Sequence, residues 1–369
     1  MFEKYDNFIV KEPFYSGYKL MNMKDLNKEK PEIFICTSNR SAGKTTFFNG
    51  YAVHDFLQNA NKFLLLFRNK YEAENAVESF FNDIGKIFFS GLMMIQQPIV
   101  KNVCYRLIIG EAIDLEDEKA KFEGVCCGYV CSLAAAEQVK RSSHLLSDCN
   151  KILFDEFQSE NGKYLKNEIS ALMSIHDSVA RGAGQQVKYL PLYLIGNLID
   201  LFNPYYEELG ISRRLNEDCN FMRGNGWVLE QGFNEASAQA HKDSAFHKAF
   251  SSAEYTVASQ KKEYLKTDTQ FINPNIENRG LYMGTILHKN NRYGVRYIES
   301  INVYYVSEKP DKCSKTIFAA TPSDISDNAI YFKRHNFKET LQTRLHTGLL
   351  LFDSKKSKDA GLSFIYGKD

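Results

Sequence analysis

One short turn constrains the fold of this chain more than any other feature. Residues 38–45 read Ser-Asn-Arg-Ser-Ala-Gly-Lys-Thr and follow the apolar run 32–38. After the turn, apolar and aromatic side chains recur at three-to-four spacing, which predicts an amphipathic helix over 44–60. A second apolar run at 63–67 completes a strand–loop–helix–strand unit. Such a unit implies a right-handed crossover and a largely parallel sheet covered by helices.

The turn matches a phosphate-binding P-loop, except that Ser38 stands where the motif has its first glycine. In a P-loop the backbone N–H groups and the helix N-terminus hold phosphate, and Lys44 would reach its β and γ oxygens. The hydroxyl of Thr45 would bind Mg²⁺. We therefore expect ATP and Mg²⁺ as ligands of one continuous segment, namely Ser38, Asn39, Arg40, Ser41, Ala42, Gly43, Lys44, Thr45 and Thr46.

Two further strand ends carry polar side chains suited to this chemistry. The apolar run 151–157 contains Asp155 and Glu156, in the order expected of a Walker B element. Asp155 would hold the metal, and Glu156 would orient and deprotonate the attacking water. The run 190–196 is followed by Asn197, where such ATPases place a sensor of the γ-phosphate. The acidic pair therefore predicts ATP hydrolysis and not storage of the nucleotide.

Phosphoryl transfer also requires positive charge near the γ-phosphate, often an arginine from a neighbouring subunit. Spacing alone does not choose among the basic residues, because most of the 46 Lys and Arg must lie on the surface. The candidates are Arg40, Arg68, Lys140, Arg141 and Arg181.

The length of 369 residues predicts two compact domains, because a single core usually stops growing before this size. A polar connector is expected from 207 to 267, with a helical stretch at 234–264. Beyond 268, alternating patterns within 281–308 predict antiparallel strands, and a helical segment is expected near 328–346. The carboxyl-terminal part is therefore expected to be an α+β domain.

Composition excludes several other classes. The eight cysteines lack the paired spacing of a zinc site or a disulfide scaffold, so a reducing compartment is expected. No stretch approaches about 18 consecutive apolar residues, which argues against a membrane protein and for a soluble, intracellular one. The formal net charge of +1 gives no global attraction to nucleic acid, so any binding has to use a local basic patch or an assembled ring.

Together these motifs resemble the DNA packaging (encapsidation) ATPases of small short-tailed bacteriophages that use a packaging RNA, a branch related to terminase large subunits. The resemblance covers the turn 38–45 with its internal Arg40, the stretch 154–157, and the segments 167–181 and 195–206, in family order. It spans most of the first two hundred residues.

The resemblance implies a P-loop NTPase domain of the additional-strand catalytic glutamate type at 1–206, a connector at 207–267, and an α+β, RNase H-like vestigial nuclease at 268–369. It makes Asn197 the residue that couples hydrolysis to motion. Arg181 resembles the arginine finger that acts on a neighbour's nucleotide, and Lys140 falls where such motors carry a second basic residue near that site.

The implied activity is ATP-driven translocation of double-stranded DNA through the portal into a preformed capsid. The expected setting is a homo-oligomeric ring of five subunits, docked through packaging RNA on the procapsid in the host cytoplasm, without a membrane. Basic residues near the C-terminus either contact DNA phosphates nonspecifically or form a merely solvated basic face, namely Lys333, Arg334, Lys338, Arg344, Lys355, Lys356 and Lys358.

Two alternatives remain open at the level of sequence. A terminase with an active nuclease would need an acidic metal cluster, for which Glu299, Asp327 and Asp353 are available without a convincing pattern. A nucleotide-binding scaffold that never hydrolyses ATP would explain the atypical Ser38 but is disfavoured by Glu156.

Overall fold

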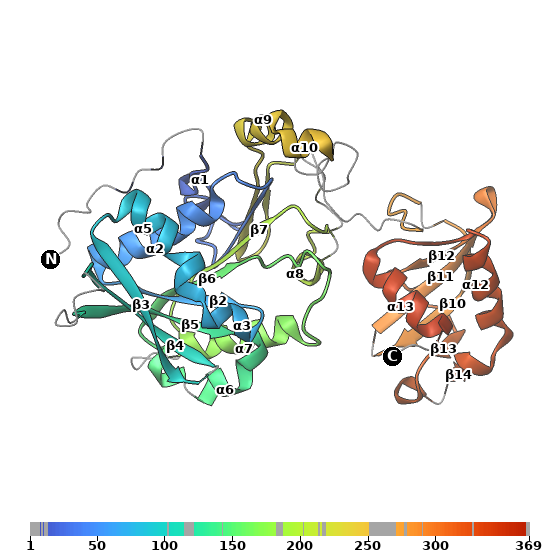
Figure 1. The fold of residues 1–369 in the computed structure, drawn as a ribbon. Helices are drawn as coiled ribbons and strands as arrows, with labels where there is room; N and C mark the ends of the chain where they lie inside the picture. Colours follow the sequence, from blue (N-terminus) through green and yellow to red (C-terminus); the bar gives the residue numbers. More distant parts are fainter. Residues whose placement is uncertain are drawn as a thin grey trace. The chain divides into compact units, whose positions relative to one another are not determined.

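The computed structural model divides the chain into two compact units, Met1–Leu209 with Leu215–Lys266, and Gly210–Arg214 with Thr267–Asp369. Each unit is described by itself (Figure 1). The structure describes residues 8, 10, 14–101, 103–113, 122–141, 143–181, 187–201, 203–212, 215, 219–250, 271–276, 279–289, 291–326 and 328–366.

A nine-stranded sheet forms the first unit, in the order β3-β4-β5-β2-β6-β7-β1-β9-β8. Its six central strands are parallel: β1 Ile33–Ser38, β2 Lys62–Phe67, β5 Gly124–Ser132, β6 Cys149–Asp155, β7 Leu192–Asn197 and β9 Trp227–Gln231. The edge strands are antiparallel to their neighbours: β3 Leu92–Val100, β4 Cys104–Glu111 and β8 Phe221–Arg223. Because β7 lies between β1 and β6, the carboxyl ends of these three strands meet at one edge.

The predicted mixed α/β fold with a large parallel sheet is confirmed. The four apolar runs form β1, β2, β6 and β7, and the predicted amphipathic helix is α2, Lys44–Asn59. The buried side chains of α2 include Phe47 and Phe48, which join one core cluster together with alternate residues of the sheet such as Phe34 and Tyr193. The apolar residues that recur at three-to-four spacing in the sequence thus form the face of α2 that packs on the sheet.

Shorter helices complete the first unit. Four of them precede β3 in the sequence: α1 Tyr18–Met21, α3 Lys70–Glu74, α4 Ala76–Phe80 and α5 Asn82–Phe88. Figure 1 shows α6 Ala136–Arg141 and α7 Glu168–Ala180 next to each other, in agreement with their contacts. The remaining helices are α8 Pro204–Glu208, α9 Glu235–Asp243 and α10 Ala245–Ala249.

The predicted connector at 207–267 is wrong in its first part. Strand β9 pairs in parallel with β1, and Trp227 at its start is buried between β1 and the edge strand β8. Backbone hydrogen bonding along β1 and burial of this apolar strand make 221–231 part of the first unit instead of a separate segment. Within the predicted helical stretch 234–264, residues 235–249 form α9 and α10, and residues 251–264 lie outside the described residues.

The second unit contains a six-stranded sheet in the order β14-β13-β10-β11-β12-β15. The predicted antiparallel strands are β10 Leu281–His288, β11 Asn291–Ile298 and β12 Val303–Ser307. Three short strands run parallel to their neighbours: β13 Ile317–Ala319, β14 Ala329–Tyr331 and β15 Leu350–Phe352. Helices α12 Asn336–His346 and α13 Lys355–Tyr366 contribute Leu341 and Phe364 to its core.

The helix expected near 328–346 begins later than predicted. Residues 329–331 are extended because they pair with β13 as strand β14. The helix starts only after His335, whose Nδ1 accepts a hydrogen bond from the backbone N–H of Phe337 at 3.1 Å and caps the helix.

Candidate nucleotide-binding site

The turn between β1 and α2 has the backbone shape of a phosphate loop. Ser41 and Gly43 have left-handed φ values of 60° and 93°, and Gly43 is the residue that directly precedes α2. The φ of Ser41 lies in the narrow left-handed region open to residues with a Cβ, but the φ of Gly43 lies beyond it, so Gly43 is the position where glycine is required. The loop therefore brings its N–H groups and the amino end of α2 to the carboxyl edge of the sheet.

Lys44 is buried and turned towards the loop. Its ammonium group donates hydrogen bonds to Ser38 Oγ at 2.8 Å, to the carbonyl of Asn39 at 3.2 Å and to Asn197 Oδ1 at 3.1 Å. Burial lowers the pKa of Lys44 from its ordinary value. The serine that replaces the first glycine of the motif thus accepts a hydrogen bond from Lys44, and Asn197 meets the same lysine from the neighbouring strand β7.

Asp155 lies at the end of β6, beside the first turn of α2. Burial raises the pKa of Asp155 to about 6, opposed by a side-chain hydrogen bond with Thr45, while the nearby Glu156 carboxylate raises it further. A hydroxyl paired with a carboxylate whose charge is poorly compensated fits a hard divalent cation such as Mg²⁺. Thr45 and Asp155, the two predicted metal ligands, are therefore together.

Glu156 is exposed and has a left-handed backbone, with φ 55°. Its N–H donates to Asp155 Oδ1 at 2.9 Å, and its carbonyl accepts from Arg68 Nη1 at 3.2 Å. A non-glycine residue in this region costs free energy, and such residues concentrate where the surrounding structure holds a functional group in place. The turn therefore presents the Glu156 carboxylate to solvent next to Asp155.

A buried ion pair behind this turn was not predicted from the sequence. Arg68, at the end of β2, donates from Nε to both Glu168 oxygens at 3.1 Å and from Nη2 to the Phe157 carbonyl at 2.6 Å. Glu168 also accepts from the Tyr205 hydroxyl at 2.5 Å. These contacts hold Arg68 inside its own subunit, whereas an arginine finger has to reach a neighbour's nucleotide. No local motif in the sequence connects residues 68 and 168.

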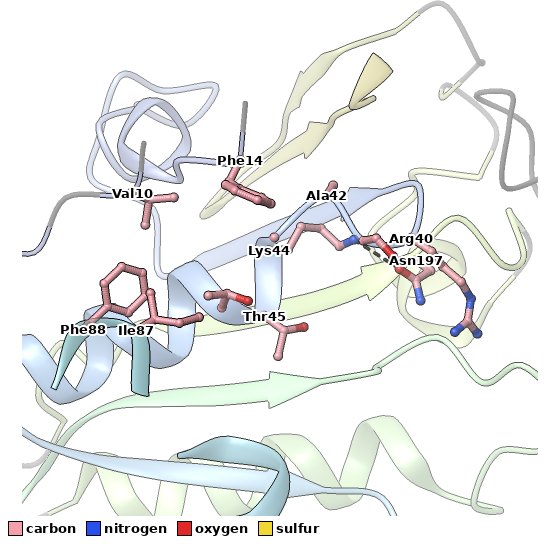
Figure 2. Close-up of a pocket in the computed structure, with 12 residues that line it drawn as sticks. Val10, Phe14, Arg40, Ala42, Lys44, Thr45, Ile87, Phe88 and Asn197 are labelled. Atoms are coloured by element: carbon pink, nitrogen blue, oxygen red, sulfur yellow. Dashed lines mark hydrogen bonds between the residues drawn. The ribbon is translucent and has the colours of Figure 1, made fainter. Parts of the chain in front are cut away.

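The loop lines a cavity of about 790 Å³, shown in Figure 2. Arg40, Lys44 and Asn197 lie at one end of it, and Val10, Phe14, Ile87 and Phe88 at the other. Asp155 and Glu156 line an adjoining cavity of about 530 Å³, and Thr45 borders both. The predicted loop, metal-ligand and catalytic glutamate positions are thus contiguous around Thr45.

Helix α9 contacts the outer side of the loop. Asn39 and Asn234 exchange two hydrogen bonds, of 3.1 and 2.8 Å, and Ser237 Oγ donates to the carbonyl of Arg40 at 2.7 Å. The Arg40 side chain forms an ion pair with Glu160, which follows the acidic turn. Residues 39 and 40 are therefore held from two sides, by a helix and by the loop after β6.

Lys140 and Arg181 are exposed and line a different cavity of about 740 Å³, together with His144 and Asp177. Lys140 lies in the last turn of α6, and Arg181 directly follows α7. Neither residue lines the two cavities that border Thr45. The structure thus brings together the two basic residues that the sequence assigned to a neighbour's nucleotide and leaves them apart from the subunit's own loop.

The acidic candidates of the second unit do not converge. Glu299 is exposed in a short 3₁₀ turn, Asp353 Oδ2 accepts from the backbone N–H of Glu308 at 3.0 Å, and Asp327 lies outside the described residues. Among the residues that the structure describes, no group of three or more His, Cys, Asp or Glu side chains could hold a metal ion. Nor does any described helix combine the length and apolar character needed to span a membrane.

Fold and site define a mixed α/β protein whose large parallel sheet carries a lysine-bearing loop, an acidic pair and an asparagine on adjoining strand ends. The chain belongs to the Podovirus DNA encapsidation protein (Gp16) family, whose model matches residues 14–366. It is 21% identical over 329 residues to the DNA packaging protein of Bacillus phage B103, covering 87% of this chain and 92% of that protein.

Two solved structures share the fold over nearly the whole chain. The chain in the bacteriophage Phi-29 viral genome packaging motor assembly has a TM-score of 0.66 at 18% identity, covering 96% of this chain and 98% of that one. The Phi-28 gp11 DNA packaging motor has a TM-score of 0.61 at 17% identity, covering 97% and 99%. The resemblance stated from the sequence is therefore confirmed at the level of the family.

Proposed function

We propose that this protein is the ATP-hydrolysing subunit of a motor that packages double-stranded DNA into a preformed viral capsid. The observation that carries the proposal is the meeting of Lys44, Thr45, Asp155 and Asn197 at neighbouring strand ends. Membership of an encapsidation family supplies the substrate to be moved, and the structural relatives are packaging motors.

Each residue of the loop has a separate task in this proposal. The backbone of residues 38–46 and the Lys44 ammonium bind the triphosphate of ATP, and Lys44 exchanges its present partners for phosphate oxygens. Thr45 and Asp155 hold Mg²⁺, which when bound neutralises charge on the phosphates. The Glu156 carboxylate accepts the proton of the attacking water. Asn197 responds to the γ-phosphate through its contact with Lys44.

The position of β7 between β1 and β6 supports assignment to the additional-strand catalytic glutamate type of P-loop NTPase. With an inserted strand, the glutamate after the metal-binding aspartate has room for a water between itself and the γ-phosphate. The exposed Glu156 next to Asp155 suits that task.

The placement of Arg181 and Lys140 supports the proposal of a ring of subunits. Both lie outside the cavities around Thr45, so their charge is useful to hydrolysis when they reach the nucleotide of a neighbour. Such a contact joins two different faces of adjacent subunits. Repeated copies of the contact close into a ring when the rotation between subunits permits it. We propose five subunits, attached through the portal and packaging RNA to the procapsid in the host cytoplasm.

The second unit is proposed to be an RNase H-like domain that has lost its nuclease site. Its strand order supports this assignment, with three antiparallel strands, β10 to β12, followed by β13 and β14 running parallel to β10. Its basic residues would contact DNA phosphates without reading sequence.

Translocation is tested by displacement of a triplex-forming oligonucleotide from double-stranded DNA. Protein assembled on portal should release the third strand with ATP and Mg²⁺, and Lys44→Ala protein should not. Release without hydrolysable ATP, or equal release by Lys44→Ala, would contradict the proposal.

The trans assignment is tested by mixing two inactive variants. Glu156→Gln subunits retain Arg181, and Arg181→Ala subunits retain Glu156, so mixed rings should recover part of the ATPase activity. Arg223→Ala, which removes an arginine of strand β8, is the matched control and should remain active alone. Absence of recovery in rings shown to be mixed would place Arg181 outside the site.

A further inference from the structure

The cavity beside the phosphate loop is polar at one end and apolar at the other. Its polar end carries Arg40, Lys44 and Asn197, which would face the γ-phosphate side of a bound nucleotide. Figure 2 shows Val10 and Phe14 on one side of the opposite end, and Ile87 and Phe88 across from them. A nucleoside triphosphate has the same polarity, with charge at one end and a flat ring at the other.

Two side chains of the apolar end are unusually exposed. Phe14 is 57% and Ile87 61% exposed, although both belong to a compact unit with a large core available. Single exposed apolar residues are common on protein surfaces and carry no message alone. Here, however, both line the cavity that ends at Lys44 and Thr45, so burial of a flat apolar ligand would cover both.

The Phe14 side of the cavity is fixed to the phosphate loop. The backbone N–H of Tyr15 donates to the carbonyl of Ala42 at 2.8 Å, and the Tyr15 hydroxyl donates to Glu230 Oε2 on β9 at 2.6 Å. A Cβ built on Gly43 would lie 3.3 Å from Phe14 Cβ. Phe14 is therefore held against the loop by its neighbour, at a fixed distance from the phosphate-binding backbone.

The opposite side is equally supported. Ile87 and Phe88 end helix α5, and the Phe88 ring packs edge-on against Phe8 with centroids 4.9 Å apart. Phe8 in turn lies 5.8 Å from the buried Phe47 of α2. The two walls thus rest on the same core as the phosphate loop and are built before any ligand arrives.

We propose that Phe14 and Ile87 form the binding site for the nucleotide base, which is held by stacking and apolar contact between them. The proposal rests on the proposed ATPase function of the same cavity. Loss of base stacking on an aromatic side chain by alanine substitution weakens affinity by about 5- to 150-fold, so a loss of at least about tenfold is expected here. Purines offer a larger face than pyrimidines, so ATP binds more tightly here than CTP or UTP.

The test separates the base from the phosphates by comparing ATP with inorganic tripolyphosphate. Dissociation constants of both, with Mg²⁺, are measured by calorimetry for wild type, Phe14→Ala and Ile87→Ala. The variants should bind ATP about tenfold more weakly and bind tripolyphosphate as wild type does. Phe14→Trp should keep or improve ATP affinity, which shows that a flat surface at this position is what matters.

Matched controls come from residues of similar exposure elsewhere. Phe250→Ala, at 55% exposure, and Leu26→Ala, at 63%, should leave both dissociation constants unchanged. The informative case is a Phe14→Ala variant with the melting temperature of wild type. If this variant binds ATP and tripolyphosphate equally more weakly, or binds both as wild type does, the base site is refuted and the ATPase proposal stands. If wild type binds neither compound, the ATPase proposal itself falls.

Discussion

The Lys44 ammonium lies 3.1 Å from the side-chain oxygen of Asn197, so a hydrogen bond joins the start of α2 to the end of β7. The two residues are 153 positions apart, and the pairing of Ser38 with Asn197 in adjacent parallel strands brings them together. A phosphate that attracts Lys44 would break or redirect this bond. In the proposed function, Asn197 would thereby respond to the state of the nucleotide.

Replacing Asn197 with alanine should separate binding from turnover. ATP affinity should change less than about threefold, because the loop backbone and Lys44 are retained. The rate of hydrolysis should fall about 10- to 100-fold, in the range of a lost polar contact in a site that stabilises charge. Steady-state kinetics with calorimetric binding measure both quantities. Asn225→Ala, which removes an exposed contact with Asn27, should behave as wild type. A loss of binding equal to the loss of rate would contradict this role.

Removing Arg68 should destabilise the first unit strongly. Arg68→Ala leaves the buried Glu168 carboxylate without its main partner, which costs about 3–5 kcal/mol in comparable buried pairs. Arg68→Lys should recover only part of the lost stability, because an ammonium group cannot reproduce the bidentate contact of the guanidinium with Glu168. Urea unfolding followed by circular dichroism measures the change.

The exposed pair of Lys62 and Asp148 is the control for this effect. Lys62→Ala should cost less than about 1 kcal/mol, as is usual for ion pairs in contact with solvent. Similar losses for Lys62→Ala and Arg68→Ala would show that burial of the Arg68–Glu168 pair has no special weight.

Asp155 makes the stability of the ligand-free protein depend on pH. Its pKa is raised from an ordinary 3.8 to about 6, so the folded state binds the proton more tightly than the unfolded chain does. Stability therefore declines as pH rises from about 4 through 6, and the loss persists above that pH. Asp155→Asn should raise the melting temperature at pH 7.5 by about 2–4 °C, for a gain of about 1–2 kcal/mol after discounting for partial exposure.

Scanning calorimetry at pH 4 and pH 7.5 checks the sign. At pH 4 the advantage of Asp155→Asn should vanish, because wild type is then protonated. With Mg²⁺ and ATP present at pH 7.5, wild type should gain more stability than the variant. A variant that is less stable than wild type at pH 7.5 without ligand would show that the Asp155 carboxylate is already compensated.

Gly43 should be intolerant of a side chain for two separable reasons. Its φ of 93° strains any residue with a Cβ, and that Cβ would meet Phe14. Gly210 also has a left-handed φ, of 68°, but open space around it. Both Gly→Ala changes should cost about 1–2 kcal/mol of stability, and only Gly43→Ala should weaken ATP binding, by tenfold or more in calorimetry. Equal binding by both variants would mean that the loop shape does not matter.

The sequence predicted the parts of this site that depend on local pattern. The strands and the helix α2 have clear periods, and Lys44, Asp155 and Asn197 each stand at the end of an apolar run, where a parallel sheet gathers polar groups. Strand β9 was missed because its five residues carry no period long enough to distinguish it from a loop. The bond between Arg68 and Glu168, and the placement of Phe14 beside Gly43, depend on tertiary packing across many residues and leave no signal in local spacing.

The central claim is ATP hydrolysis at this site, and the most direct test is steady-state turnover with and without double-stranded DNA. Wild type and Glu156→Gln are compared, with ATP binding measured on the same samples. The account predicts that both proteins bind ATP, that wild type hydrolyses it faster with DNA, and that Glu156→Gln hydrolyses it at least about 100-fold more slowly. Wild-type protein that binds ATP but never hydrolyses it in an assembled ring, or a Glu156→Gln variant as fast as wild type, would contradict the account.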